Sequence, residues 1–171
     1  MQALNKFRAA KWRSYTINLL LLVILVASIR IWQHRDMVSG MAPALEGVTL
    51  AGQPYTLPTH TNNPVLIHFW STWCSICRLE QSTINAIARN DASVVTIAMQ
   101  SGQPDEVSQH MQEQDIDFLV INDQEGTISR AWGVHAVPAS FIISPDGEIR
   151  FIEVGYTTSI GLKLRMWLAG L

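Results

Sequence analysis

The stretch HFWSTWCSICRLE, residues 68–80, guides the interpretation of the whole chain. It begins inside an apolar run from Val65 to Trp70, which is typical of a buried strand, and it ends in a segment with helical periodicity. The only two cysteines of the chain, Cys74 and Cys77, lie at this junction with the spacing C-x-x-C. Because residues i and i+3 share one face of a helix, their sulfur atoms are close enough to bond.

The position of the cysteine pair indicates redox chemistry. If Cys74 opens the helix, its sulfur faces backbone N–H groups without helical partners and the positive end of the helix dipole. Both features favour the thiolate, which is the reactive form of cysteine. Cys77, one turn further along, is expected to be more buried and to resolve a mixed disulfide formed at Cys74.

Two other uses of the same spacing compete with this interpretation. A structural zinc site needs about four ligands, and the sequence contains no second C-x-x-C and no histidine pair with ligand spacing. A permanent disulfide between Cys74 and Cys77 would close a loop too short to stabilise the fold much. A strand followed by W-C-x-x-C and a helix favours a redox-active pair over both.

The composition limits the classes of function. The chain has 171 residues, of which 48% are apolar, enough for one domain with a proper core and an additional segment. Six Lys or Arg and no acidic residue occur up to Arg35, whereas six Lys or Arg stand against fourteen Asp or Glu from Asp36 onward. An acidic body argues against nucleic-acid binding, which needs a basic surface.

The basic N-terminus precedes a candidate membrane anchor. A helix over residues 14–32 would be roughly 28 Å long, close to the roughly 30 Å hydrocarbon core of a bilayer. Arg30 and Trp32 would lie at its far edge. Because cations are concentrated before this segment, residues 1–13 are expected to stay cytoplasmic.

The anchor predicts where the rest of the chain resides. We expect a single-pass protein of a bacterial inner membrane, with a linker over residues 33–44 and a domain of residues 45–171 in the periplasm. The alternative is a signal peptide cleaved near residues 26–28, which would export the same domain. Either reading places the cysteine pair in an oxidising compartment, where it is a stable or a working disulfide.

Downstream of the anchor, apolar runs alternate with segments of helical periodicity. After a hairpin that turns around residues 51–53, strands are predicted at residues 65–70, 94–99, 118–121, 139–143 and 149–155. Helices are predicted at residues 74–90, 104–114, 127–132 and 159–168. This order predicts an α/β fold with a mixed, partly parallel β-sheet that is covered by helices on both faces.

Several motifs resemble those of the thioredoxin superfamily. Residues 69–80 are similar to F-W-A-T-W-C-x-x-C-R-x-E of its membrane-anchored extracytoplasmic branch, the TlpA-, ResA- and DsbE-like thiol–disulfide oxidoreductases. Residues 42–57 resemble the N-terminal hairpin of that branch, and residues 133–141, GVHAVPASF, resemble its G-V-x-x-x-P-x-x-F motif. The resemblance covers roughly residues 42–170 and implies a thioredoxin-like fold in which residues 104–121 form the central helix–strand insert of the branch.

The resemblance also implies roles for individual residues. Pro138 would be a cis proline facing the cysteine pair, and the backbone of Val137 would pair with an extended client segment. Trp73 would line the contact surface for partners. Glu80 is the last residue of the first motif, and a carboxylate near the buried thiol would relay its proton. The alternative for Glu80 is an ordinary solvated glutamate on a helix.

These motifs predict a membrane-tethered protein disulfide oxidoreductase that needs no bound cofactor. Cys74, Cys77 and Glu80 would be catalytic, while Trp73 and the Val137–Pro138 backbone would bind the client. The commoner role within the branch is that of a reductant, which a transmembrane thiol reductase of the DsbD type resupplies with electrons. Clients in the branch include apocytochrome c and copper-handling proteins.

A different class of function uses the same cysteines to hold a metal. A copper or zinc metallochaperone would bind its ion with Cys74, Cys77 and a histidine, since thiolates suit copper. Copper chaperones with this fold typically use C-x-x-x-C, which is one residue longer. A peroxiredoxin would need the frame P-x-x-x-[ST]-x-x-C, and Ile67 occupies its proline position here.

Overall fold

The computed structural model describes Tyr15, residues 17–26, Ser28, residues 37–90 and residues 93–171. The described residues between 15 and 28 are helical, and no helix in the described parts of the chain is both long and apolar enough to cross a membrane. The remainder of the anchor predicted over residues 14–32, the basic segment before it and part of the predicted linker lie outside the described residues. The chain divides into two units between Met37 and Val38, and the second unit carries the cysteine pair.

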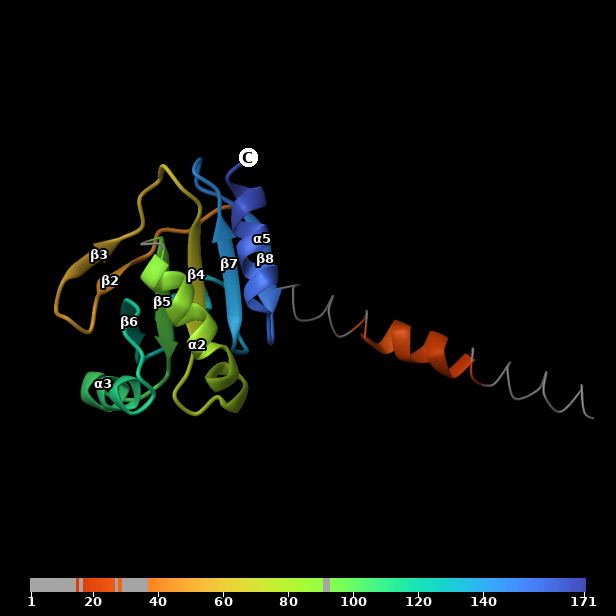
Figure 1. The fold of residues 1–171 in the computed structure, drawn as a ribbon, viewed down its shortest axis with the longest axis horizontal. Coiled ribbons are helices and arrows are strands. Elements are labelled where there is room, and N and C mark those ends of the chain that lie inside the picture. Colours follow the sequence, from red (N-terminus) through yellow and green to blue (C-terminus); the bar gives the residue numbers. More distant parts are fainter. Residues whose placement is uncertain (1–14, 16, 27, 29–36, 91–92) are drawn as a thin grey trace, which may run out of the picture. The chain divides into compact units, whose positions relative to one another are not determined.

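A six-stranded mixed sheet forms the centre of this second unit (Figure 1). Its spatial order is β1 (Gly40–Met41), β8 (Glu148–Val154), β7 (Ala139–Ile143), β4 (Val65–Trp70), β5 (Val94–Met99) and β6 (Val120–Asp123). β4, β5 and β6 are parallel, whereas the pairings of β4 with β7, β7 with β8 and β8 with β1 are antiparallel. β4 is central and entirely buried, as its continuous apolar run predicts.

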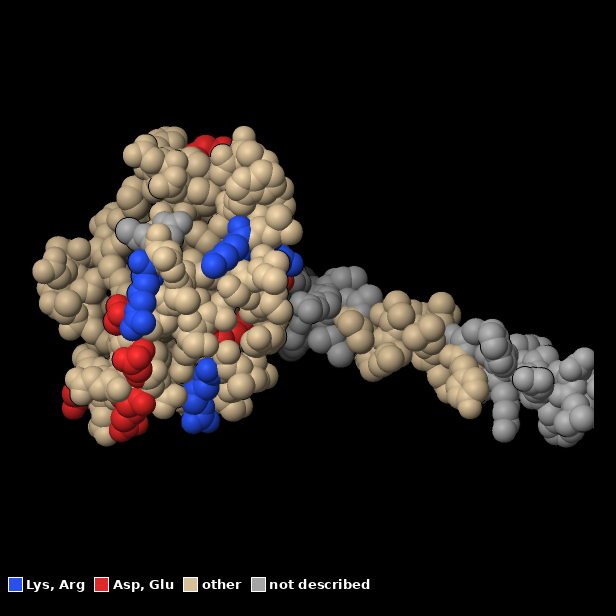
Figure 2. All heavy atoms as spheres, in the orientation of Figure 1, with Lys and Arg blue, Asp and Glu red and all other residues tan. Residues whose placement is uncertain are grey.

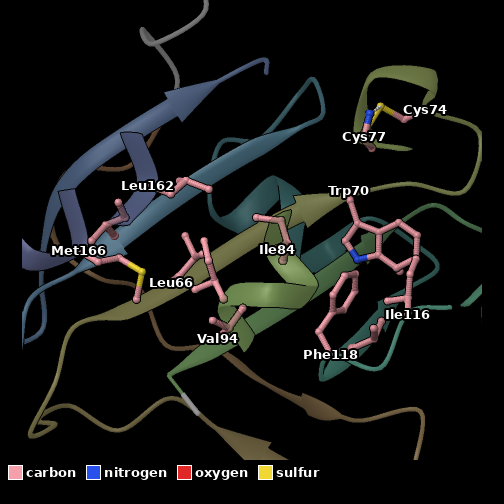
Figure 3. Close-up of a cluster of buried hydrophobic side chains, with 14 of the residues drawn as sticks. Leu66, Trp70, Cys74, Cys77, Ile84, Val94, Ile116, Phe118, Leu162 and Met166 are labelled. Atoms are coloured by element: carbon pink, nitrogen blue, oxygen red, sulfur yellow. Dashed lines mark hydrogen bonds between the residues drawn. A yellow bond between two sulfur atoms is a disulfide. The ribbon is translucent and has the colours of Figure 1, made fainter. Parts of the chain in front are cut away.

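Four helices surround the sheet: α2 (Ser75–Asn90), α3 (Pro104–Glu113), α4 (Thr127–Ala131) and α5 (Ser159–Ala169). Because side chains alternate along a strand, Leu66 and Trp70 of β4 point to one face of the sheet. There they join a buried cluster with Ile84 of α2 and with Leu162 and Met166 of α5 (Figure 3). The two cysteines lie at the edge of this cluster, beyond Trp70 at the end of β4.

The opposite face of the sheet is closed by aromatic rings. Phe69 of β4 and Phe141 of β7 pack with Trp132, the residue that follows α4, and their ring centroids are 5.0–6.0 Å apart. All three side chains are fully buried. This contact holds α4 against the sheet, and α4 leads directly into the loop that carries Pro138.

Most of the predicted elements are confirmed. The hairpin consists of β2 (Glu46–Val48) and β3 (Pro54–Thr56), and the fold is the mixed α/β arrangement that the sequence predicts. β6 covers residues 120–123 instead of 118–121, because Phe118 packs edge-on against Trp70 and does not join the ladder with β5. The short strand β1 lies within the segment predicted as a linker, where no periodic pattern indicates it.

Candidate active site

The cysteine pair follows a turn that is hydrogen-bonded to the loop after β5. Ser71 Oγ donates a hydrogen bond to the Met99 carbonyl (2.9 Å), and the Thr72 N–H donates to Ser101 Oγ (3.1 Å). The indole of Trp73 donates to the Gln100 carbonyl (3.1 Å), so this exposed ring is held beside the cysteines. These contacts fix the path of the chain from the end of β4 into α2.

Cys74 and Cys77 form a disulfide, with their Cα atoms 5.3 Å apart. α2 begins at Ser75, one residue after its predicted start, so Cys74 immediately precedes the helix. The N–H of Cys77 donates to Cys74 Sγ (3.1 Å), an arrangement that stabilises negative charge on that sulfur once the disulfide opens. Cys74 is 7% exposed and Cys77 is fully buried, so a partner reaches the pair only through Cys74.

The loop before β7 faces the cysteines. The Val137–Pro138 peptide bond is cis, and Cys74 Sγ lies 3.6 Å from the Val137 carbonyl oxygen. The Pro138 carbonyl accepts a hydrogen bond from the Gly155 N–H (2.9 Å), which joins this loop to the segment after β8. The structure therefore brings Val137 and Pro138 to Cys74, although they are distant from it in sequence.

Glu80 lies one helical turn after Cys77 and is 1% exposed, so the interpretation of a solvated helix glutamate is wrong. Its carboxylate accepts a hydrogen bond from the backbone N–H of Thr157, in the loop between β8 and α5. Burial raises the pKa of Glu80 to about 7, against the opposing effect of that hydrogen bond. With this raised pKa, Glu80 would change its charge near neutral pH, one helical turn after the buried Cys77.

The histidines near the motif do not form a metal site. His68 is buried in β4, where its Nδ1 atom lies 2.9 Å from Ser140 Oγ, and burial lowers its pKa to about 4. His135 is exposed on the loop before Val137. Within the described ranges, no group of three or more His, Cys, Asp or Glu side chains is arranged to hold a metal ion. No donor set in the described part of the chain thus favours the metallochaperone alternative.

Three functional contacts have no signal in the sequence. Ser101 accepts a hydrogen bond from the active-site turn, Thr157 donates one to Glu80, and Asp123 accepts one from α4. The first two join residues that are far apart in the sequence, and the third spans a turn that matches no motif. The carboxylate of Asp123, which is 2% exposed, accepts hydrogen bonds from the Ser129 N–H (2.8 Å), Ser129 Oγ (2.7 Å) and the Ile128 N–H (3.1 Å). The side chain thus accepts hydrogen bonds from the first turn of the short helix that leads to Pro138.

We expect Asp123→Ala to lower the free energy of unfolding by about 3 kcal/mol, because it leaves buried donors without their charged acceptor. Asp117→Ala is the matched control: its carboxylate is 56% exposed in an ion pair with Arg89, and its loss should cost less than about 1 kcal/mol. Chemical denaturation of the three proteins measures the difference. Equal effects of the two substitutions would show that Asp123 does not support α4.

Comparisons with known proteins agree with this geometry. The model of the AhpC/TSA family matches residues 38–152. The chain is 29% identical over 154 residues to a thioredoxin-like protein of Haemophilus influenzae, covering 90% of this chain and 92% of that protein. It is 26% identical over 129 residues to the thiol–disulfide oxidoreductase ResA of Geobacillus thermodenitrificans, covering 74% of each.

A solved structure is also similar to this chain. A thiol:disulfide interchange protein of the thioredoxin family from Chlorobium tepidum aligns with a TM-score of 0.66 at 25% identity, over 78% of this chain and 98% of that one. The chain belongs to the AhpC/TSA family and is a thiol–disulfide oxidoreductase of the DsbE and ResA type, with Cys74 and Cys77 as its cysteine pair.

Proposed function

We propose that this chain is a membrane-tethered reductant of protein disulfides on the outer side of a bacterial inner membrane. The observation that supports disulfide exchange in this proposal is the asymmetry of the pair. Cys74 is slightly exposed, accepts the Cys77 N–H and faces the Val137 carbonyl, whereas Cys77 is sealed behind it. In such a pair the exposed sulfur forms a mixed disulfide with the client, and the buried sulfur then attacks that disulfide and releases the client.

The reaction transfers two electrons from the pair to the client. The Cys74 thiolate attacks a client disulfide, so that a bond forms between Cys74 and one client sulfur while the other leaves as a thiolate and takes up a proton. The Cys77 thiol then loses its proton to Glu80 and attacks Cys74 Sγ. This step releases the second client thiol and leaves the Cys74–Cys77 disulfide, which is the state of the structure.

The surface around Cys74 suits an extended client segment. The backbone of Val137 is next to the sulfur and is available for strand-like pairing, as at the edge of a sheet. Trp73 and Ile76 are 61% and 47% exposed on either side of Cys74 in sequence and offer apolar contact area. We assign client binding to Trp73, Val137 and Pro138, and proton transfer to Glu80.

The membrane location in this proposal is supported by the N-terminal sequence. The uncharged run over residues 14–29, with cations before it, supports a single-pass anchor that leaves the second unit in the periplasm. A transmembrane thiol reductase of the DsbD type would return electrons to the disulfide. Apocytochrome c and copper-handling proteins are the client classes that this role suggests, and the acidic body argues against a nucleic-acid partner.

Thiol trapping in living cells tests the direction. Cells that express the full chain are quenched with acid, and free thiols are labelled with a maleimide that shifts the protein on a gel. We expect most of the chain to carry two labels, and to lose them when the transmembrane thiol reductase is deleted. A chain that stays oxidised whether or not that reductase is present would contradict the role of reductant.

A further inference from the structure

Helix α5 presents an apolar face to solvent. Leu162, Met166 and Ala169 pack inward, yet Ile160, Leu164, Trp167, Leu168 and, past the helix end, Leu171 are 42% to 85% exposed. Their spacing places them along one side of the helix. We refer to these five residues as the α5 stripe. A contiguous apolar patch on the surface of a domain marks a site that binds a protein, a membrane or a ligand.

The charge around the stripe differs from that of the rest of the domain. The sequence of α5 contains Lys163 and Arg165 and no acidic residue, although the chain from Asp36 onward has an excess of acidic side chains. Arg165 is paired with Glu153 (2.6 Å), and Lys163 is exposed beside the stripe. In the view of Figure 2 a Lys or Arg side chain lies over α5, and the surface next to it is uncharged. An anionic surface would therefore meet less repulsion at α5 than at the rest of the acidic domain.

The chain enters the domain at a strand that pairs with β8, one of the two strands over which this helix packs. β1 pairs with β8, with Gly40 opposite Ile149, and α5 packs over β7 and β8. Residues 33–39, even fully extended at about 3.5 Å each, span at most roughly 25 Å. If the proposed anchor ends near residue 32, this tether keeps the edge of the sheet beside α5 within reach of the bilayer surface.

We propose that the α5 stripe docks on the anionic lipid surface of the membrane that holds the anchor. Apolar side chains would enter the interfacial layer, as in helices that lie in the membrane plane. Trp167 has the amphipathic ring that favours this layer, and Lys163 would reach the lipid phosphates. The lipid surface fits better than a second copy, because α5 has no acidic side chain to meet the Lys163 of a copy.

Docking would also place the cysteine pair. The loop before α5 donates from Gly155 to the Pro138 carbonyl and from Thr157 to Glu80, so the N-terminal end of the stripe, at Ile160, adjoins the active site. A docked α5 therefore holds Cys74 near the bilayer surface. There it would meet the membrane-embedded thiol reductase of the proposed function, on which this consequence rests.

Fluorescence quenching tests the proposal on the full chain in vesicles of phosphatidylethanolamine and phosphatidylglycerol. Brominated lipids quench tryptophans in the bilayer, and the difference between wild type and Trp167→Phe isolates the signal of Trp167. We expect Trp167 to be quenched, and Leu164→Ser to abolish its quenching. Val48→Ser is the matched control: it replaces a comparably exposed apolar side chain in the β2–β3 hairpin and should leave the quenching unchanged.

Two outcomes would overturn the proposal. Trp167 could be as accessible to aqueous iodide in vesicles as in detergent, which would mean that no lipid covers it. Alternatively, sedimentation in detergent could reveal a dimer that Leu164→Ser dissociates, which would identify a second copy as the occupant. Reduction of a soluble disulfide protein by Leu164→Ser in detergent should match wild type, so a failure of the redox function would be seen separately.

Discussion

Replacing Cys74 with serine should reduce thiol–disulfide exchange by the full chain to the rate of the uncatalysed reaction. Cys74 is the only sulfur of the pair that a client can reach, because Cys77 is fully buried. A serine hydroxyl at this position cannot form the mixed disulfide through which both electrons pass. The measurement is the turnover of a model disulfide protein with dithiothreitol as the terminal reductant.

The control for this loss is Ser82→Ala, which alters an exposed residue on the same helix and should keep wild-type turnover. The two proteins should also unfold at the same denaturant concentration after reduction, which separates chemistry from folding. Substantial turnover by Cys74→Ser would mean that Cys77 is accessible in solution. In that case the proposed division of labour between the two sulfurs would be wrong.

Glu80→Gln should slow the release step by roughly 10²-fold, the low end of what a positioned proton acceptor contributes. Glu80 is buried one turn after Cys77, and burial raises its pKa to about 7. In the wild type, release of the client thiol should accelerate as the pH rises through about 7, because ionised Glu80 accepts the Cys77 proton. Glutamine is nearly isosteric but accepts no proton, so the variant should lose this acceleration. Stopped-flow measurement of thiol release from a preformed mixed disulfide gives the rate at each pH.

The same substitution predicts a change in stability with pH that does not depend on activity. Between pH 4.5 and about 7, Glu80 of the unfolded chain is ionised while the folded oxidised protein keeps the proton. The folded state then binds more protons, so its stability falls as the pH rises through this window and levels off above it. Glu80→Gln should remove that fall, whereas Glu46→Gln, at an exposed position, should retain it. If the stability of wild type and Glu80→Gln changed with pH in parallel, burial would not raise the pKa of Glu80.

The parts of the fold that depend on local periodicity could be predicted from the sequence. The apolar run of β4 and the helical spacing after Cys74 place the cysteine pair at a strand–helix junction, where the structure has it. The spacing of three residues between Cys77 and Glu80 correctly puts both on one helix face. The position of Val137 and Pro138 beside the pair came from the resemblance to known motifs, since nothing in their spacing from Cys74 indicates contact.

The parts that depend on distant contacts could not be predicted. The burial of Glu80 arises because the loop after β8 covers it and donates the Thr157 N–H, a contact across 77 positions. Ser101, in the loop after β5, likewise accepts a hydrogen bond from Thr72, which is distant in the sequence. Hydrogen bonds of this kind leave no periodic trace, and common residues such as serine and threonine give no warning of them. Strand β1 could not be predicted because a strand of two residues is too short to show a periodic pattern.

The most direct test of the account uses Cys77→Ser, in which Cys74 is the only cysteine left. The reduced variant is mixed with a disulfide-bonded peptide, and the intact protein mass is measured without reductant. We expect one peptide to become attached through Cys74 and to stay attached, because the sulfur that would release it is gone, until dithiothreitol removes it. A variant that keeps its unmodified mass would contradict the central claim that Cys74 is the sulfur that exchanges with partner proteins.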